Sequence, residues 1–299
     1  MSDSSKNYAL ALHGGAGPVL GRDYGQTEKH LFELASKCRE QLISGTSALD
    51  VVEYAVNELE TCGLYVAGRG SAPNSAGHVE LDASIMDGAS REAGAVAVLQ
   101  DFVSPIEVAR GVMEKTPHVM LAGSGAVTFA RNAGFEEVLS PADYYTLPVG
   151  VTQDDINDAG HGTVGAVALD QAGRLAAATS TGGTFGKLQG RIGDTPLIGP
   201  GTWADDNIAV SCTGIGEHII RAGGASSIAF RFKSGIPLHD AVQEMLDEVA
   251  RLGGDAGVIA VTRDGQIAMP YNSDGMKRAA ASSDTELTVA TFAQERGSL

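Results

Sequence analysis

Two short apolar runs near the middle of the chain place the strongest constraint on its fold. Residues 160–170 contain one run and residues 174–183 the other, and Gln171-Ala172-Gly173 between them has the composition of a tight turn. This pattern predicts a β-hairpin. Because the two strands have similar lengths, their outer ends meet, and we expect Thr163 and Thr181 to lie side by side there.

The rest of the chain alternates between segments typical of helices and segments typical of strands. Ser47, three residues before Asp50, is placed to cap the start of a helix. Apolar residues recur at helical spacing in segments 27–44, 47–59, 106–115, 125–132, 217–223, 225–233 and 239–252. Short apolar or alternating runs predict strands at 8–12, 79–85, 93–99, 119–121, 208–212, 258–261 and 266–269.

Hairpins occur in both halves of this order, and pairs of helices separate them. We therefore expect an α+β fold in which antiparallel sheets carry helices on their outer faces. The 299 residues allow one large domain or two ordinary ones. His13-Gly14-Gly15 is expected to end the first strand, segment 140–160 reads as an exposed loop or linker, and the tail from Ala279 reads as polar.

The chain is acidic, with Lys+Arg 21 against Asp+Glu 37 and a formal net charge of −16. No cluster of Lys and Arg marks a surface that follows phosphates, so neither nucleic acid nor an anionic membrane is expected as a partner. Three cysteines without metal-ligand spacing argue against a disulfide framework or a zinc site and favour a reducing compartment. The first ten residues lack the features of a signal peptide, and we expect a cytoplasmic protein.

Several familiar catalytic motifs are absent from the sequence. No serine has the flanking glycines of a G-x-S-x-G elbow, no H-E-x-x-H occurs, and Gly186-Lys187 lacks the rest of a P-loop. The dispersed histidines read as surface or buried structural residues. What remains is threonine chemistry at the central hairpin.

A threonine hydroxyl is a weak nucleophile and needs a base. A threonine at a chain terminus carries its own, because a free α-amine titrates near about 7.7–8.0. Thr163 would gain such an amine if the Gly162–Thr163 bond were cut, and Gly162 tolerates the strained backbone that this requires. The alternative is that a strand simply begins at Thr163.

Motifs spread over nearly the whole chain help to decide whether Thr163 is a nucleophile or only the start of a strand. In order, they are residues 13–17 (HGGAG), 67–71 (AGRGS), 81–88 (LDASIMDG), 161–165 (HGTVG), 179–183 (TSTGG), 190–196 (GRIGDTP) and 211–217 (SCTGIGE). With them the chain resembles the plant-type asparaginase / isoaspartyl peptidase family of N-terminal-nucleophile hydrolases. Glycosylasparaginases are relatives, and they usually have Asn at the position of Gly182. The family resemblance implies a four-layer αββα sandwich.

The resemblance also implies roles for single residues. Thr163 is the expected nucleophile, with its freed amine as base, and Thr181 bonds near it. Arg191 is expected to grip the α-carboxylate of the substrate, for which its planar fork is suited, and Asp194 its α-ammonium; the alternative is an ion pair within their loop. The Thr213 hydroxyl and the Gly214 N–H are expected to form the oxyanion hole, and Gly216 to give the substrate room or a carbonyl contact.

The loop at residues 59–71 resembles the sodium loop of the family, in which backbone carbonyls ring one cation. Hard cations accept carbonyl oxygens, so the chemistry is reasonable. The expected carbonyls are those of Leu59, Glu60, Cys62, Tyr65, Ala67 and Arg69. The chain departs from the family at Val66, where Asn is common near the catalytic threonine.

Taken together, the resemblance implies an isoaspartyl peptidase / L-asparaginase that acts on β-aspartyl dipeptides and L-asparagine. One domain would be cleaved into chains 1–162 and 163–299, and two such pairs would form a homodimer. No cofactor is expected for the chemistry. A structural Na⁺ is the one ion that the resemblance implies. The alternatives are a glycosylasparaginase and an uncleaved, non-catalytic homologue that acts as a binding protein.

Overall fold

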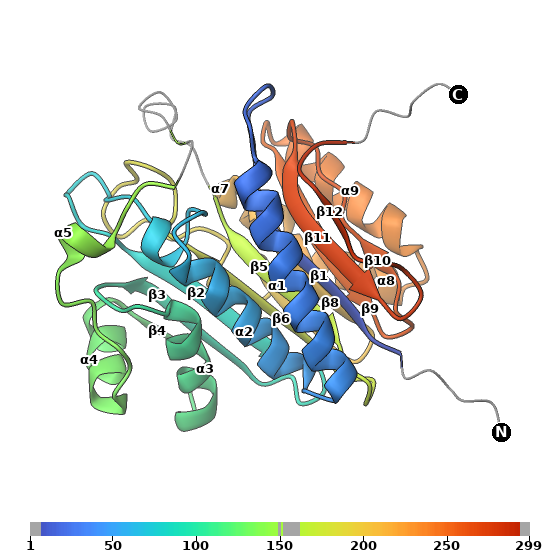
Figure 1. Cartoon of the computed structure of the whole chain (residues 1–299), viewed down its shortest axis with the longest axis horizontal. Coiled ribbons are helices and arrows are strands. Elements are labelled where there is room, and N and C mark those ends of the chain that lie inside the picture. Colours follow the sequence, from blue (N-terminus) through green and yellow to red (C-terminus); the bar gives the residue numbers. More distant parts are fainter. Residues whose placement is uncertain (1–6, 149–150, 152–161, 294–299) are drawn as a thin grey trace.

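The structure, a computed structural model, describes residues 7–148, 151 and 162–293. In this part of the chain, helices pack on two β-sheets (Figure 1). The strands are β1 (Ala9–Ala16), β2 (Leu81–Asp87), β3 (Ala93–Leu99), β4 (Met120–Ala122), β5 (Val164–Leu169), β6 (Leu175–Thr181), β7 (Thr202–Ala204), β8 (Ile208–Gly214), β9 (Ala256–Thr262), β10 (Ile267–Ala268), β11 (Met276–Ser282) and β12 (Thr288–Ala290). The helices are α1 (Gly25–Ser44), α2 (Ala48–Thr61), the 3-10 turn η1 (Gly68–Gly70), α3 (Pro105–Lys115), α4 (Gly123–Ala133), α5 (Pro141–Tyr144), α7 (Gly216–Ala222), α8 (Gly224–Lys233) and α9 (Leu238–Arg251).

The larger sheet has eight strands in the order β12-β11-β1-β5-β6-β2-β3-β4, and the smaller has four in the order β10-β9-β8-β7. In the larger sheet β4 pairs parallel to β3, while the other described pairs are antiparallel. The expectation of two purely antiparallel sheets is therefore wrong for the larger one. The physical reason is that the chain returns from β3 through helix α3, and such a crossover brings the next strand back in the same direction.

Apolar side chains form separate clusters on the two sides of each sheet. Helices α1, α2 and α3 contact the larger sheet, and α8 and α9 contact the smaller one. The sheets also pack on each other, with β5 and β6 against β8 and β1 against β9. Strands β5 and β6 are buried on both faces, which explains their continuous Ala- and Val-rich sequences.

The central hairpin forms as predicted. Val164 pairs with Ser180 and Leu169 with Leu175, in an unbroken antiparallel register. The Asp170 carboxylate accepts the backbone N–H of Ala172 at 2.9 Å, which stabilises the turn between the strands. The larger sheet thus has a rigid pair of strands at its centre, and Thr163 directly precedes the first of them.

Local sequence signals explain where several helices begin and end. The Ser47 side chain accepts the backbone N–H of Asp50 at 3.2 Å, so the predicted cap of α2 is confirmed. Gly45 ends α1 with φ +95°, a left-handed conformation that glycine adopts without steric cost. No helix within the described ranges is both long enough and apolar enough to span a bilayer.

Three expectations need correction. Strand β1 continues through His13 to Ala16, with a bulge between these two residues, instead of ending at Leu12. The tail read as polar from Ala279 contains the end of β11 and all of β12. Strand β11 lies between β1 and β12 and owes its conformation to that pairing. Segment 140–160 includes the short helix α5, and its residues 149–150 and 152–160 lie outside the described part.

Candidate active site

The backbone at the outer end of the central hairpin is held by a threonine hydroxyl. Thr181 Oγ donates a hydrogen bond of 2.5 Å to the carbonyl oxygen of Gly162, and Thr181 Oγ in turn accepts the N–H of Gly183 at 2.9 Å. Thr163, the residue after that carbonyl, is 5% exposed. The expectation that the two threonines meet at one end of the hairpin is thus confirmed in position.

Two glycines allow the backbone to come this close. A Cβ on Gly15, whose φ is +102°, would lie 3.3 Å from the carbonyl oxygen of Thr163. A Cβ on Gly162 would lie 2.6 Å from Cβ of Val66. A side chain at either position would therefore push the Gly162–Thr163 bond out of place. Val66, the residue that departs from the family pattern, is in direct contact with the bond.

A buried histidine holds the other side of Thr163. His13 Nδ1 lies 3.2 Å from the carbonyl oxygen of Thr163, and Nε2 lies 2.9 Å from Ser211 Oγ. The carbonyl can only accept, so Nδ1 carries the proton and Nε2 accepts from the Ser211 hydroxyl. Burial lowers the pKa of His13 to about 3, against the opposing effect of its bond to Thr163, and the ring is neutral at pH 7. His13 belongs to the buried structural class that the sequence favoured, but its contact with Thr163 was not anticipated.

Further buried hydroxyls extend this hydrogen-bonded chain away from His13. Ser211 Oγ lies 2.8 Å from Thr179 Oγ, and Thr179 Oγ accepts from Thr202 Oγ at 2.6 Å. Thr202 Oγ accepts from Ser84 Oγ at 2.7 Å, and all these side chains are buried. Such a satisfied polar network has few alternative arrangements, so it fixes the spacing between the two sheets under Thr163.

The end of β8 and the start of α7 lie beside the hairpin. Thr213 Oγ accepts the backbone N–H of Ala16 at 3.2 Å, which leaves the Thr213 hydroxyl proton able to donate elsewhere. Gly214 has φ +140°, and a Cβ there would lie 2.5 Å from the Asp255 carbonyl oxygen. Only glycine fits that backbone, so the position of the Gly214 N–H next to Thr213 is fixed by sequence.

The predicted head-group residues are brought together around Gly216. A Cβ on Gly216 would lie 3.0 Å from Arg191 Nη2 and 3.0 Å from Asp194 Oδ1. The side chain of Arg191 makes a two-pronged ion pair with Glu217, with Nε–Oε1 at 2.7 Å and Nη2–Oε2 at 2.6 Å. These bonds lower the pKa of the Glu217 carboxyl below its ordinary value. The sequence-based alternative paired Arg191 with Asp194 and missed Glu217.

A buried ion cluster holds the loop that carries Arg191. Lys187 Nζ lies 3.5 Å from Glu80 Oε2 and 3.9 Å from Asp82 Oδ2, and it donates to the Arg191 carbonyl at 3.2 Å. The Glu80 carboxylate also accepts the N–H of Gly190 at 3.1 Å. The sequence analysis missed this cluster. The Glu80-Leu-Asp82 pattern at the start of β2 was the one feature of the sequence that could have indicated it. The cluster fixes the backbone on which the guanidinium is mounted.

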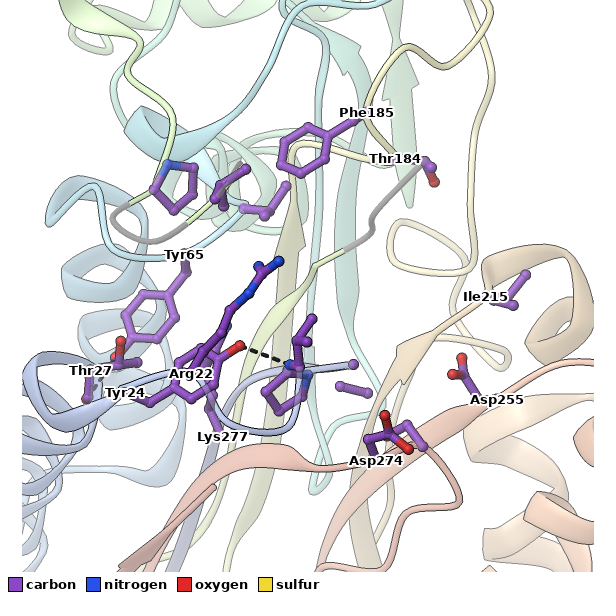
Figure 2. A pocket seen from close by; sticks show the side chains of 18 of the residues that line it. Arg22, Tyr24, Thr27, Tyr65, Thr184, Phe185, Ile215, Asp255, Asp274 and Lys277 are labelled. Atoms are coloured by element: carbon purple, nitrogen blue, oxygen red, sulfur yellow. Dashed lines mark hydrogen bonds between the residues drawn. The ribbon is translucent and has the colours of Figure 1, made fainter. Parts of the chain in front are cut away.

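A cavity of about 810 Å³ lies at this end of the sheets. Arg191, Glu217 and Lys187 line part of it, and Val66 connects it to the Gly162–Thr163 bond. Figure 2 shows further lining side chains, with Tyr24, Tyr65 and Lys277 on one side and Ile215, Asp255 and Asp274 on the other. Its volume is in the range that small-molecule sites occupy, about 300–1,000 Å³.

The predicted cation loop follows the C-terminus of α2. Leu59 and Glu60 supply carbonyls from the last turn of that helix, where such groups lack helical partners and the helix dipole favours a cation. A Cβ on Gly68 would lie 2.5 Å from the Glu60 carbonyl oxygen, and a Cβ on Gly70 would lie 1.9 Å from that of Tyr65. The turn η1 therefore packs directly on these oxygens. Several of the expected carbonyls already accept hydrogen bonds. They are those of Leu59 (from Cys62 Sγ, 3.4 Å), Tyr65 (from Ala67 N–H, 2.8 Å), Ala67 (from Gly70 N–H, 3.0 Å) and Arg69 (from Thr146 N–H, 2.9 Å).

Comparison with known proteins agrees with the geometry. A sequence model of the asparaginase family matches residues 6–147 and 139–291. An isoaspartyl peptidase of Salmonella typhimurium is 41% identical over 295 residues, which cover 90% of this chain and 94% of the relative. A probable isoaspartyl peptidase/L-asparaginase of Arabidopsis thaliana is 40% identical, covering 95% and 99%, and an isoaspartyl peptidase/L-asparaginase of Homo sapiens is 38% identical, covering 92% and 93%. The chain therefore belongs to the asparaginase family that includes the isoaspartyl peptidases/L-asparaginases.

Proposed function

We propose that the chain is an isoaspartyl peptidase / L-asparaginase that hydrolyses β-aspartyl dipeptides and L-asparagine with a threonine which it frees by cleaving itself. One observation carries the proposal: the Thr181 hydroxyl donates at 2.5 Å to the carbonyl of Gly162, directly before Thr163. Members of the family to which the chain belongs support the activity by their names.

Self-cleavage converts Gly162–Thr163 into two chain ends. Thr163 Oγ adds to the Gly162 carbonyl carbon, and its proton passes to the Thr163 nitrogen. The C–N bond then breaks, and an ester links Gly162 to the threonine oxygen. Water then hydrolyses the ester, leaving a carboxylate on Gly162 and a free amine on Thr163. The hydrogen bond from Thr181 supports this step because it stabilises negative charge that develops on the Gly162 oxygen. The products are chains 1–162 and 163–299.

In turnover, the freed amine accepts the proton of the Thr163 hydroxyl, whose oxygen attacks the side-chain amide carbon of the substrate. Ammonia or an amino acid leaves with a proton, and water then hydrolyses the aspartyl ester on Thr163 to release aspartate. The Thr213 hydroxyl and the Gly214 N–H serve as oxyanion donors. The free proton of Thr213, left by its bond from Ala16, supports this role.

The head group of the substrate is bound by Arg191 and Asp194, with room provided by Gly216. Their convergence around Gly216 supports this assignment. The substrate α-carboxylate must take the place of the Glu217 carboxylate in the fork of Arg191, since the fork holds one carboxylate at a time. Glu217 is 55% exposed and can swing into solvent.

The first test is gel electrophoresis under denaturing conditions, followed by intact-mass measurement. Purified protein should show fragments of about 17 and about 14 kDa, from their shares of the 30.7 kDa chain. Thr163→Ala should give one uncut band and release no ammonia from L-asparagine, whereas Thr163→Ser should still cleave. Turnover by an uncut wild-type chain would contradict the proposal and favour an uncleaved homologue that acts by binding.

Glycosylasparaginase activity is the less favoured alternative. A Cβ on Gly182 would lie 2.1 Å from Ser71 Oγ, so the Asn usual in glycosylasparaginases has no space here. Hydrolysis of a glycosylated asparagine compared with β-aspartyl-leucine distinguishes the two activities. We expect the dipeptide to be the better substrate.

We also propose a structural Na⁺ held by the carbonyls of residues 59–69. The packing of η1 against the Glu60 and Tyr65 oxygens, at the negative end of α2, supports it. Sodium would contribute stability and take no part in bond making. Replacing Na⁺ by tetramethylammonium should lower the melting temperature if the loop binds the ion.

Assembly and location complete the proposal. We assign the layers to the four-layer αββα sandwich of N-terminal-nucleophile hydrolases, and expect two cleaved pairs to form a homodimer in the cytoplasm. Cys38, Cys62 and Cys212 are all free thiols, which supports a reducing compartment. Light scattering should give twice the 30.7 kDa of one chain.

A further inference from the structure

Lys277 is a cation in the cavity wall that no step of the proposed reaction uses. It lies on β11, is half-buried, and lines the cavity on the side of Tyr24 and Tyr65 (Figure 2). Its ammonium lies 5.3 Å from the centre of the Tyr24 ring, over which it makes a cation–π contact. No carboxylate within the described ranges forms an ion pair with it. Burial lowers the pKa of Lys277 to about 8.

Three other cations line the same cavity, Arg22, Lys187 and Arg191, and the last two are paired with carboxylates. Arg191 is paired with Glu217, and Lys187 lies between Glu80 and Asp82. An ammonium that faces a cavity with an aromatic ring as its partner has lost water without gaining a counter-charge. A carboxylate brought by a ligand would supply the missing negative charge, so the position of Lys277 favours binding of an anion.

The side chain starts close to the bond that reacts. Gly14 separates them: a Cβ on Gly14 would lie 3.4 Å from Cβ of Lys277, and a Cβ on the next residue, Gly15, would lie 3.3 Å from the Thr163 carbonyl oxygen. Two consecutive residues of β1, Gly14 and Gly15, thus lie between the Cβ atom of Lys277 and the backbone of Thr163.

Tyr24 adds a second donor at the same place. Its hydroxyl oxygen accepts the backbone N–H of Val19 at 2.8 Å, so the hydroxyl proton remains able to donate. The ring is held edge-on against Phe292, with centroids 5.9 Å apart. Tyr24 and Lys277 both line the cavity, and Asp255 and Asp274 are gathered at the other side, where they disfavour an anion.

We propose that Lys277 and Tyr24 form the subsite for the carboxylate of the leaving amino acid in β-aspartyl dipeptides. The inference rests on the proposed function, in which Arg191 and Asp194 hold the aspartyl head group. A dipeptide has a second carboxylate on its leaving residue, whereas L-asparagine releases ammonia and presents nothing to this subsite. Lys277 is therefore a specificity-determining residue that favours dipeptides over L-asparagine.

The first experiment changes the substrate and leaves the protein intact. The wild-type enzyme is given β-aspartyl-leucine, β-aspartyl-leucinamide and L-asparagine, and kcat/KM is measured for each. Because the amide lacks the second carboxylate, we expect its kcat/KM to be roughly 10- to 100-fold below that of the acid. Equal values for the acid and the amide would overturn the subsite.

The second experiment removes the charge. Lys277→Met should lower the ratio of kcat/KM for β-aspartyl-leucine to that for L-asparagine by roughly 10- to 100-fold, and should abolish the preference for acid over amide. Lys277→Arg should restore both. Lys29→Met is the matched control, since Lys29 on α1 has a side chain that is 77% exposed and lies outside the cavity; its ratio should equal that of the wild type.

The outcomes separate the subsite from the function on which it rests. In Lys277→Met, kcat/KM for β-aspartyl-leucine and for L-asparagine could fall equally, so that their ratio stays within about twofold of wild type. That result overturns the subsite and leaves the proposed function standing. Failure of the cleaved wild-type enzyme to hydrolyse any of the three substrates overturns the function and the subsite together. Fragment pattern and melting temperature of Lys277→Met confirm that the comparison is made on folded, cleaved enzyme.

Discussion

The hydroxyl of Thr181 donates its proton to the carbonyl oxygen of Gly162 across 2.5 Å, on the residue directly before Thr163. The bond joins the outer ends of β5 and β6, whose register from Val164 to Leu169 is unbroken. A donor fixed on a rigid strand costs little reorganisation when charge develops on the oxygen. The Gly162 carbonyl, at the bond where we propose self-cleavage, is thus already polarised.

Thr181→Val should slow self-cleavage by about 10²- to 10³-fold, because it removes this donor while keeping the side-chain shape. Thr181→Ser keeps the hydroxyl and should cleave at a rate within a few-fold of wild type. The measurement is the time course of fragment appearance after purification. Wild-type cleavage kinetics in Thr181→Val would show that the hydrogen bond is structural only.

Val66→Asn should speed self-cleavage. Val66 touches Gly162, and the resemblance places an Asn at this position in related enzymes. An amide there adds a polar partner beside the reacting bond, where valine offers none. The same fragment time course checks the expectation, with Val66→Leu as an apolar control; slower cleavage by Val66→Asn than by Val66→Leu would contradict it.

Glu217→Gln should lower KM for L-asparagine by roughly two- to fivefold. In the wild type the substrate carboxylate must displace the Glu217 carboxylate from Arg191, whereas in the variant it displaces only a neutral amide. The gain is small because the Glu217 side chain is 55% exposed and its ion pair is screened by water. Steady-state kinetics at fixed ionic strength measures it. A higher KM would mean that Glu217 chiefly orients the guanidinium.

His13→Gln should make the folded protein less sensitive to acid. Burial lowers the pKa of His13 from 6.5 to about 3, so the unfolded chain binds a proton in this range that the folded chain does not. The histidine therefore favours unfolding increasingly as the pH falls from 6.5 towards 3. The wild-type unfolding free energy should fall about 1.4 kcal/mol per pH unit more steeply than that of the variant.

Urea unfolding from about pH 7 down to about pH 5 measures this difference. The glutamine amide of the His13→Gln variant keeps an N–H that can donate to the Thr163 carbonyl and does not titrate in this range, so comparison of the two slopes isolates the histidine. Parallel slopes would show that His13 is solvated or protonated in the folded state.

Local elements and several of their boundaries follow from the amino-acid sequence alone. Apolar runs around a Gln-Ala-Gly turn specified the β5–β6 hairpin, because the turn residues and the pairing strands are neighbours in the chain. Ser47 specified the start of α2 for the same reason. Glycine positions such as Gly15 and Gly214 were readable as special, although their reason, a close approach of distant backbone, was not.

Contacts between distant groups depend on the folded chain. Ser211 bonds to His13 across 198 residues of sequence, Arg191 pairs with Glu217 and not Asp194, and the Ala-rich β11 becomes a strand only between β1 and β12. Hydrogen-bond and ion-pair partners are set by how the two sheets pack, and no local pattern encodes that packing. The sequence thus predicted candidate residues for the chemistry, while the hydrogen-bond partners, protonation and orientation of these side chains came from the fold.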